Sequence, residues 1–131
     1  MRFMLDSNAA GAIMARHAVA RSNYSRHFGA IGMSSIVLFE LHYGLAKSQS
    51  TVFNRQILDT FFKGGVAILP FGDEEAEEAG NLRQKMETKG KPMGPYDLLI
   101  AAHALRLNST LVTRDAAFAG VDGLKVEDWT A

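Results

Sequence analysis

Four acidic residues lie in or beside apolar segments, where a carboxylate costs free energy unless a cation or hydrogen bonds compensate it. They are Asp6, Glu40, Asp97 and Asp115. Clustered carboxylates repel one another unless a cation lies among them, and oxygen ligands in a chain without cysteine suit Mg²⁺ or Mn²⁺ rather than zinc. One or two such ions beside a phosphodiester activate water and stabilise the departing oxygen. If the fold brings the four side chains together, they predict metal-assisted hydrolysis of phosphodiester bonds.

The elements that must position these acids alternate between short β-type runs and helical patterns. We therefore expect one α/β domain over residues 1–131, with a short central parallel β-sheet flanked by α-helices. The expected strands lie at residues 2–5, 31–34, 66–69, 110–113 and 125–127. The expected helices lie at residues 8–16, 22–28, 35–47, 52–62, 73–89 and 96–107, and Ser35 is expected to cap the third of them.

This chain order places two of the acids at one edge of the sheet. Asp6 directly follows the first strand, and Asp115 lies two residues after the fourth. Ligands of open parallel sheets bind beyond the carboxyl ends of the strands, where the strand order reverses, so the two acids meet if these strands are central neighbours. Asp97, in the first turn of its helix, and Glu40, one turn into the helix after the second strand, can face the same cleft.

Composition limits the class of protein. The chain has 131 residues, of which 47% are hydrophobic and 21% charged, and these are ordinary values for a globular domain. The absence of cysteine fits a reducing compartment, and the apolar runs are too short to span a membrane, so we expect a cytoplasmic protein with no membrane partner. The net charge is zero, which neither indicates nor excludes nucleic-acid binding: if four acids share a pocket, the remaining surface is basic.

Several segments, in order along nearly the whole chain, resemble one family. They are Leu5-Asp6-Ser7-Asn8, the segment from Ser34 to Gly44, the segment from Gly94 to Ala104, Leu111-Val112-Thr113-Arg114-Asp115, and the closing Glu127-Asp128-Trp129. Together they resemble a PIN-domain ribonuclease, and more narrowly a VapC-type toxin of a type II toxin–antitoxin pair. Two departures stand out: Ser7 takes a place that usually holds Thr, and the position of Asp115 varies in close relatives, often to Asn.

The resemblance implies a Mg²⁺- or Mn²⁺-dependent endoribonuclease that inhibits translation, in many members by cutting transfer RNA or ribosomal RNA. It also implies a cognate antitoxin and a homodimer. The implied catalytic residues are Asp6, Glu40, Asp97 and Asp115, with Asp6, Asp97 and Asp115 as metal ligands and Asn8 and Thr113 in support. Candidate RNA contacts are Arg83, Lys85 and Arg114.

Simpler interpretations of the same residues stay open. Asp6 can cap a helix, Glu40 can be solvated, Asp97 can favour a helix dipole, and Asp115 can be an ordinary turn residue. The histidines lack metal-ligand spacing, so His42 and His103 are expected to be packed or solvated. The acidic run at residues 73–78 is expected to be a solvated helix start, and the basic residues that follow it a solvated face or an RNA contact.

Two other kinds of function compete with RNA cleavage. One is a non-catalytic interaction module whose acids bind a basic peptide. The other is a metal-dependent DNA nuclease or phosphatase of similar architecture, although an aspartyl phosphatase would usually have an acid where this chain has Asn8. The two helices between Ser35 and Phe62 carry more apolar residues than a thin domain buries, which predicts a homodimer. Those residues include Leu38, Leu45, Phe53, Leu58 and Phe61.

Overall fold

Five short parallel strands form one sheet at the centre of the computed structural model, which describes residues 1–49 and 51–131, with side chains from residue 54 onward in the second segment. The strands are β1 (Phe3–Leu5), β2 (Ile31–Ser34), β3 (Ala67–Leu69), β4 (Thr110–Val112) and β5 (Val126–Glu127). Their order is β3-β2-β1-β4-β5, and every pairing is parallel. The strand order therefore reverses between β1 and β4, which confirms that these two strands are central neighbours.

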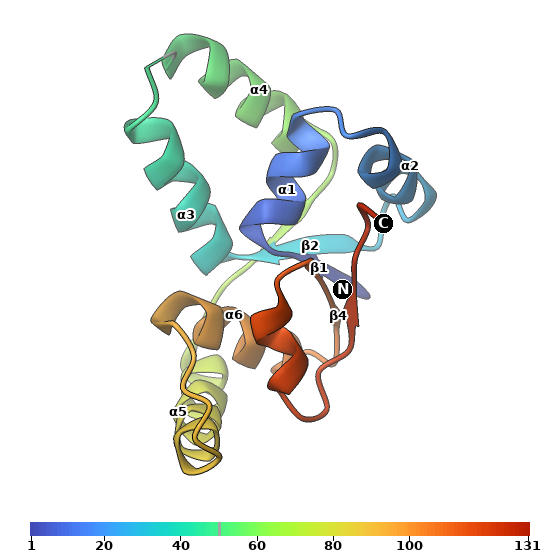
Figure 1. Ribbon diagram of the computed structural model, residues 1–131. Coiled ribbons are helices and arrows are strands. Elements are labelled where there is room, and N and C mark those ends of the chain that lie inside the picture. The colour runs from blue at the N-terminus through green and yellow to red at the C-terminus, as the bar shows by residue number, and fades with distance from the viewer. Residues whose placement is uncertain (50) are drawn as a thin grey trace.

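Helices cover both faces of the sheet (Figure 1). On one face lie α1 (Ser7–Met14), α2 (Ala18–Arg26), α3 (Ser35–Ala46) and α4 (Thr51–Lys63). On the other lie α5 (Asp73–Thr88), α6 (Pro95–Arg106) and the short 3₁₀ helix η1 (Ala116–Gly120). α5 packs along α6, and α3 contacts α6 at the edge of the sheet. The predicted α/β architecture is thus confirmed.

The sequences of the central strands explain why they lie inside. Parallel strands covered on both faces read as continuous apolar runs, and β1 is such a run. Phe3, Met4 and Leu5 are each at most 1% exposed. α6 supplies a second apolar surface from Ile100 to Ala104, also buried. The core therefore fixes β1, which directly precedes Asp6, and α6, which carries Asp97.

At two helices the capping residue lies earlier in the chain than the sequence led us to expect. The N-cap of α3 is Ser34 rather than Ser35, because the Ser34 hydroxyl accepts the Ile36 N–H at 3.1 Å. α2 begins at Ala18 rather than Ser22, since the His17 ring accepts the Ala20 N–H at 3.2 Å. In both places the capping side chain precedes the predicted start, as helix N-caps must.

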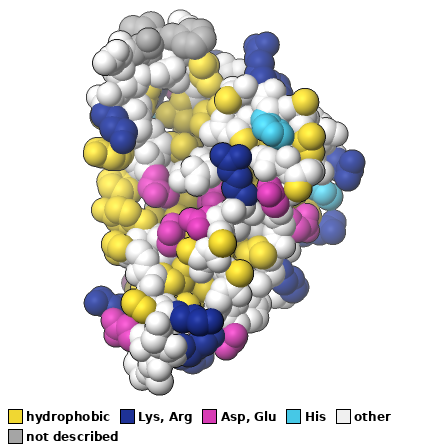
Figure 2. All heavy atoms as spheres, in the orientation of Figure 1, with side chains coloured by type: hydrophobic (Ala, Val, Ile, Leu, Met, Phe, Trp, Pro, Cys, Tyr) yellow, Lys and Arg dark blue, Asp and Glu magenta, His cyan; other side chains and the backbone are white. Residues whose placement is uncertain are grey.

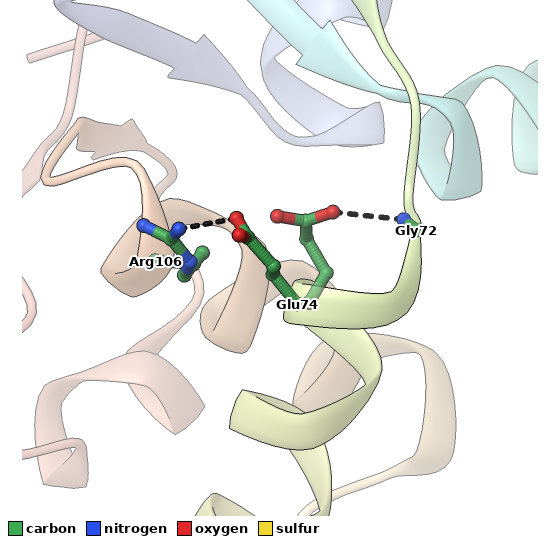
Figure 3. Close-up of polar contacts among 4 residues, drawn as sticks. Gly72, Glu74 and Arg106 are labelled. Carbon is green, nitrogen blue, oxygen red and sulfur yellow. Dashed lines mark hydrogen bonds and ion pairs between the residues drawn. The ribbon is translucent and has the colours of Figure 1, made fainter.

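The acidic start of α5 is not fully solvated as predicted. The Glu75 side chain is buried and accepts the Gly72 N–H at 2.8 Å, because a helix begins with backbone N–H groups that have no partner within it. Its neighbour Glu74 pairs with Arg106 of α6 (Figure 3). The first turn of α5 is therefore held to its own preceding loop and to α6.

Two segments near the C-terminus pack onto the rest of the fold. Residues 116–120, for which the sequence predicted no element, form η1, which the Asp115 carboxylate caps. Trp129 is 3% exposed, and its ring lies 5.2 Å from that of Phe3 and stacks on His27 at 5.5 Å. Trp129 therefore holds the end of the chain against β1.

The apolar residues of α3 and α4 that were predicted to form a dimer surface are more buried than expected. Leu58 and Phe61 belong to the core, and Leu38 and Leu45 are half-buried. Phe53 lies outside the described side chains. The exposed aromatic residues near α3 are instead Phe39, Tyr43 and Tyr96. In the described part of the chain, no helix is long and apolar enough to cross a membrane.

Candidate active site

Asp6 stands at the carboxyl end of β1 and is only 4% exposed. Its backbone N–H donates to the Val112 carbonyl of β4 at 3.1 Å, which extends the pairing of the two central strands. Its carboxylate accepts the Ala9 N–H at 2.7 Å and caps α1. A hydrogen bond from the Thr113 side chain also reaches this carboxylate. The capping interpretation of Asp6 is correct, and the same residue faces the sheet edge where ligands bind.

Thr113 and Asp115 extend this arrangement from the end of β4. Thr113 is buried, and its hydroxyl oxygen accepts the Asp115 N–H at 3.0 Å. Asp115 is exposed, and its carboxylate accepts the Ala117 N–H at 2.9 Å at the start of η1. Thr113 therefore connects the carboxylate of one acid to the backbone of another, which fits the supporting position predicted for it.

Glu40 reaches the site from α3. The residue is half-buried, and within the described residues its Oε1 atom is a buried oxygen with no hydrogen-bond partner. The Ser7 side chain donates a hydrogen bond to the Glu40 carboxylate. Ser7 received no role in the sequence-based prediction of the site. The only signal was a hydroxyl directly after Asp6, which by itself does not indicate a partner on another helix.

Asp97 occupies the first turn of α6, behind Pro95. Proline suits this position because its missing N–H is one that the helix would leave unpaired, and the helix dipole favours an acid there. The Asp97 side chain is half-buried. It thus projects from the N-terminus of a helix whose body is locked in the core.

The four acids form one electrostatic group. Burial is the main cause that raises the pKa of Asp6, Glu40 and Asp97, and mutual repulsion adds to it. Glu40 interacts with Asp97 and Asp6, and Asp97 also interacts with Asp115. Figure 2 shows acidic side chains gathered on this face of the molecule, where α3, α6 and η1 converge. The fold therefore brings the predicted acids together, as their positions in the chain indicated.

The side chains of the four acids offer the type of ligand atom that a hard cation prefers. All are oxygen donors, and the buried Oε1 of Glu40 is an acceptor for which the described residues supply no donor. Within the described residues, no three Asp, Glu or His side chains are grouped closely enough to hold one metal ion. Like charges in a buried site repel one another without a cation between them, and this repulsion adds to burial in raising the pKa values of Asp6, Glu40 and Asp97.

The other predicted site residues lie at different distances from the acids. Arg114 is exposed and lowers the pKa of Asp6, so it adjoins the group. Arg83 pairs with Glu87 at 3.3 Å on the exposed face of α5, and Lys85 is exposed on the same helix. Asn8 is exposed on α1, while Ala9 and Thr113 make the hydrogen bonds to Asp6 described above. Roles for Asn8 and for the three basic residues remain predictions.

A hollow of about 520 Å³ lies between segments that adjoin two of the acids in the chain. One wall is the loop before Asp97, with Lys91, Met93 and Gly94, and the other is η1, which follows Asp115. η1 contributes only small residues to this wall, namely Ala116, Ala117, Ala119 and Gly120.

The chain is similar to proteins of known activity. The family model described as PIN domain matches residues 3–124. The chain is 33% identical over 132 residues to the tRNA(fMet)-specific endonuclease VapC of Shigella flexneri, with 99% of each chain covered. It is 36% identical over 133 residues to ribonuclease VapC2 of Rickettsia felis, with 98% of each covered. The crystal structure of VapBC2 from Rickettsia felis bound to a promoter DNA fragment superposes with a TM-score of 0.90 at 35% identity, over 97% of this chain and 98% of that one.

Proposed function

We propose that this chain, which belongs to the VapC ribonucleases of the PIN-domain family, uses its four acids to cleave RNA with the help of Mg²⁺ or Mn²⁺. Membership of that family makes it an endoribonuclease and the toxin half of a toxin–antitoxin pair. The observation that supports the four-acid mechanism is the convergence of Asp6, Glu40, Asp97 and Asp115 at the switch point of the sheet.

The acids divide by position into two proposed roles. Asp6, Asp97 and Asp115 end or begin rigid elements and would hold the metal ion. When bound, that ion would polarise the phosphodiester and stabilise the charge that develops on the departing oxygen. Glu40 is the proposed proton acceptor, because its Oε1 has no donor among the described residues and burial raises its pKa toward the range useful at neutral pH.

The proposed reaction is hydrolysis by water. The water oxygen bonds to phosphorus while the bond from phosphorus to the 3′-oxygen breaks. The water proton passes to Glu40, and the departing 3′-oxygen takes a proton from solvent. The products are a 5′-phosphate and a 3′-hydroxyl. The Ser7 hydroxyl, which donates to Glu40, and the Thr113 hydroxyl, which donates to Asp6, keep these carboxylates oriented.

The relatives suggest the substrate and the partners. Because one relative is named for cleavage of tRNA(fMet), we propose transfer RNA as the substrate class and the initiator tRNA as the first to test. We also propose a cognate antitoxin, since solved neighbours are VapBC complexes, and a homodimer in the cytoplasm, where tRNA occurs. A guanidinium matches paired carboxylates in a planar, bidentate way, so an antitoxin Arg side chain that enters the acidic group would compete with metal and substrate.

Cleavage of initiator tRNA and of a mixed RNA pool tests the proposal. Cleavage should require Mg²⁺ or Mn²⁺, stop with chelator and be insensitive to thiol reagents, since the chain has no cysteine. The new ends should be 5′-phosphates and 3′-hydroxyls. A 2′,3′-cyclic phosphate would instead show attack by the RNA's own hydroxyl and contradict the mechanism. Binding of RNA without any cleavage in either metal would favour the interaction module.

A further inference from the structure

A buried polar contact joins the two helices that carry Glu40 and Asp97. The His103 side chain on α6 is 1% exposed, and its Nδ1 atom lies 2.8 Å from the Ser34 hydroxyl oxygen. Ser34 is fully buried at the end of β2, where it caps α3. The two residues lie 69 positions apart in the chain. A buried hydrogen bond between such distant segments is made only when the tertiary fold aligns them.

The neighbouring hydrogen bond and the burial of His103 favour one direction for this contact. The Ser34 oxygen accepts the Ile36 N–H at 3.1 Å, so its own hydroxyl proton is available to donate to His103 Nδ1. His103 then carries its ring proton on Nε2. Burial lowers the pKa of His103, with an opposing effect from Glu75, and this favours the neutral ring that such an acceptor requires. We therefore take the Ser34 hydroxyl as the donor and His103 Nδ1 as the acceptor in this contact.

The surroundings of His103 hold the contact in place. The Phe71 ring meets the imidazole edge-on with centroids 5.6 Å apart. The Phe71 N–H in turn donates to the Ser35 hydroxyl at 3.0 Å, at the start of α3. The segment before α5 thus closes over the contact and excludes water. In such a site a hydrogen bond is strong, and loss of one partner leaves the other group unsatisfied.

We propose that the hydrogen bond between Ser34 and His103 sets the position of α3 against α6 and thereby the spacing of Glu40 and Asp97. α3 begins directly after Ser34, and Glu40 lies on that helix. α6 carries both Asp97 and His103. Ser34 and His103 are positioning residues in this scheme, since neither touches substrate or metal. The effect on cleavage rests on the RNA hydrolysis proposed above, whereas the effect on Mn²⁺ affinity rests only on the proposed metal site.

The test separates the acceptor at Nδ1 from simple packing. His103→Leu fills much of the space but offers no acceptor, whereas the Oδ1 of His103→Asn replaces Nδ1 as acceptor. His103→Leu should lower kcat for RNA and the affinity for Mn²⁺ about tenfold, as loss of orienting groups behind a metal site does, and leave KM unchanged. His103→Asn should keep a kcat, a KM and a Mn²⁺ affinity close to those of wild type. Mn²⁺ affinity is measured on the metal-free protein by the loss of the free-ion paramagnetic resonance signal.

A second pair of variants controls for helix capping and for folding. Ser34→Ala removes the hydroxyl that donates to His103 and also the cap of α3. His17→Ala removes only a cap, that of α2, which carries none of the acids. Ser34→Ala should reproduce the loss of kcat and of Mn²⁺ affinity, whereas His17→Ala should not. The double variant Ser34→Ala/His103→Leu should be no worse than either single change, because both break one interaction.

Three outcomes would overturn the proposal. The first is a folded His103→Leu protein with the kcat and Mn²⁺ affinity of wild type. The second is equal impairment of His103→Asn and His103→Leu, and the third is a loss in the double variant that equals the sum of the two single losses. If every variant at Ser34 and His103 failed to fold by circular dichroism, the contact would be a requirement for folding and the positioning role would be rejected. If wild-type protein cleaves no RNA, the proposed function fails, and Mn²⁺ affinity still decides the role of the contact.

Discussion

At the scale of single residues, the site combines burial with unfavourable charge. The Asp6 carboxylate caps α1 and accepts a hydrogen bond from Thr113. Burial and the nearby Asp115 nevertheless raise the pKa of Asp6. The four acids were candidates from the sequence because each stands within a recognisable segment, and Asp6, Asp97 and Asp115 also lie at element ends. The contact between Ser7 and Glu40 was not, because it depends on how two helices pack.

Asp6→Asn should abolish cleavage while the fold remains intact. The folded-state pKa of Asp6 is raised, so its contribution to stability is full below its ordinary pKa of 3.8 and is lost as pH rises through the folded value. At neutral pH without metal, the charged Asp6 is therefore destabilising. Asn keeps an acceptor for Ala9 but has no charge. We expect cleavage about 100-fold lower or worse, from the usual cost of losing a charge-stabilising group.

Thermal melts of metal-free protein check the stability part of this prediction. The Tm of Asp6→Asn should equal or exceed that of wild type at pH 7, and the difference should shrink as pH falls toward 4. Asp59→Asn is a matched control, because Asp59 is half exposed and pairs with Arg55 on the same helix. A large loss of Tm in Asp6→Asn at pH 7 would show that its charge stabilises the fold and would contradict the argument.

Alanine substitutions should rank the acids. Asp6 is buried at the end of a core strand, whereas Asp115 is exposed and caps a short 3₁₀ helix. We therefore expect Asp6→Ala and Asp97→Ala to lose most activity, Glu40→Ala to lose less, and Asp115→Ala to lose least and to recover at high Mn²⁺. Cleavage rates measured across a Mn²⁺ titration decide the order. If Asp115→Ala is as inactive as Asp6→Ala at every concentration, Asp115 is as essential a ligand as Asp6.

At the scale of elements, the sequence predicted every strand and every α-helix, but it missed η1 and shifted several helix starts. A capping residue stands before the helix, and both Ser34 and Ser35 offered a hydroxyl there, so composition alone did not choose between them. Tertiary packing decides between them, because the Ser34 hydroxyl also contacts His103, whereas the Ser35 hydroxyl accepts the Phe71 N–H. The burial of Glu75 was missed for the same reason, since a run of acids resembles a solvated helix start until α6 covers it.

Glu75→Ala should destabilise the protein by about 1 kcal/mol, the usual value of a helix cap. The change leaves the Gly72 N–H without its acceptor, whereas Glu75→Gln keeps an acceptor oxygen and should cost much less. Urea unfolding measures both variants, and Glu77→Ala, an exposed position on the same helix, is the control. Equal losses for Ala and Gln would show that charge, rather than the hydrogen bond to Gly72, matters at this position.

At the scale of the whole molecule, topology explains why acids far apart in the chain meet. The order β3-β2-β1-β4-β5 sets the ends of β1 and β4 side by side, and α3 and α6 approach this edge from opposite faces. Alternation of strands and helices predicted the class and the meeting edge. It did not predict which apolar residues remain exposed, because that depends on which sides of α3 and α4 face the core.

The exposed apolar surface makes a homodimer the expected state. Phe39 and Tyr43 are 49% and 60% exposed one turn apart on α3, and the Phe39 ring lies 5.4 Å from that of Tyr96, which is 47% exposed. Figure 2 shows hydrophobic side chains along this edge, next to the acids. Aromatic residues grouped in this way mark the centre of many interfaces, so a second copy of the chain should cover them.

Light scattering at micromolar concentration should therefore give the mass of a dimer. Phe39→Ser combined with Tyr43→Ser should shift that mass toward the monomer, while the fold persists, because neither side chain belongs to the core. Phe28→Ser is the matched control: Phe28 is 66% exposed but lies between α2 and β2, at the opposite end of β2 from α3. A wild-type monomer would refute the dimer. A dimer that survives the double substitution but not Phe28→Ser would move the interface to the α2 end, and the acids of the two subunits would then not lie beside it.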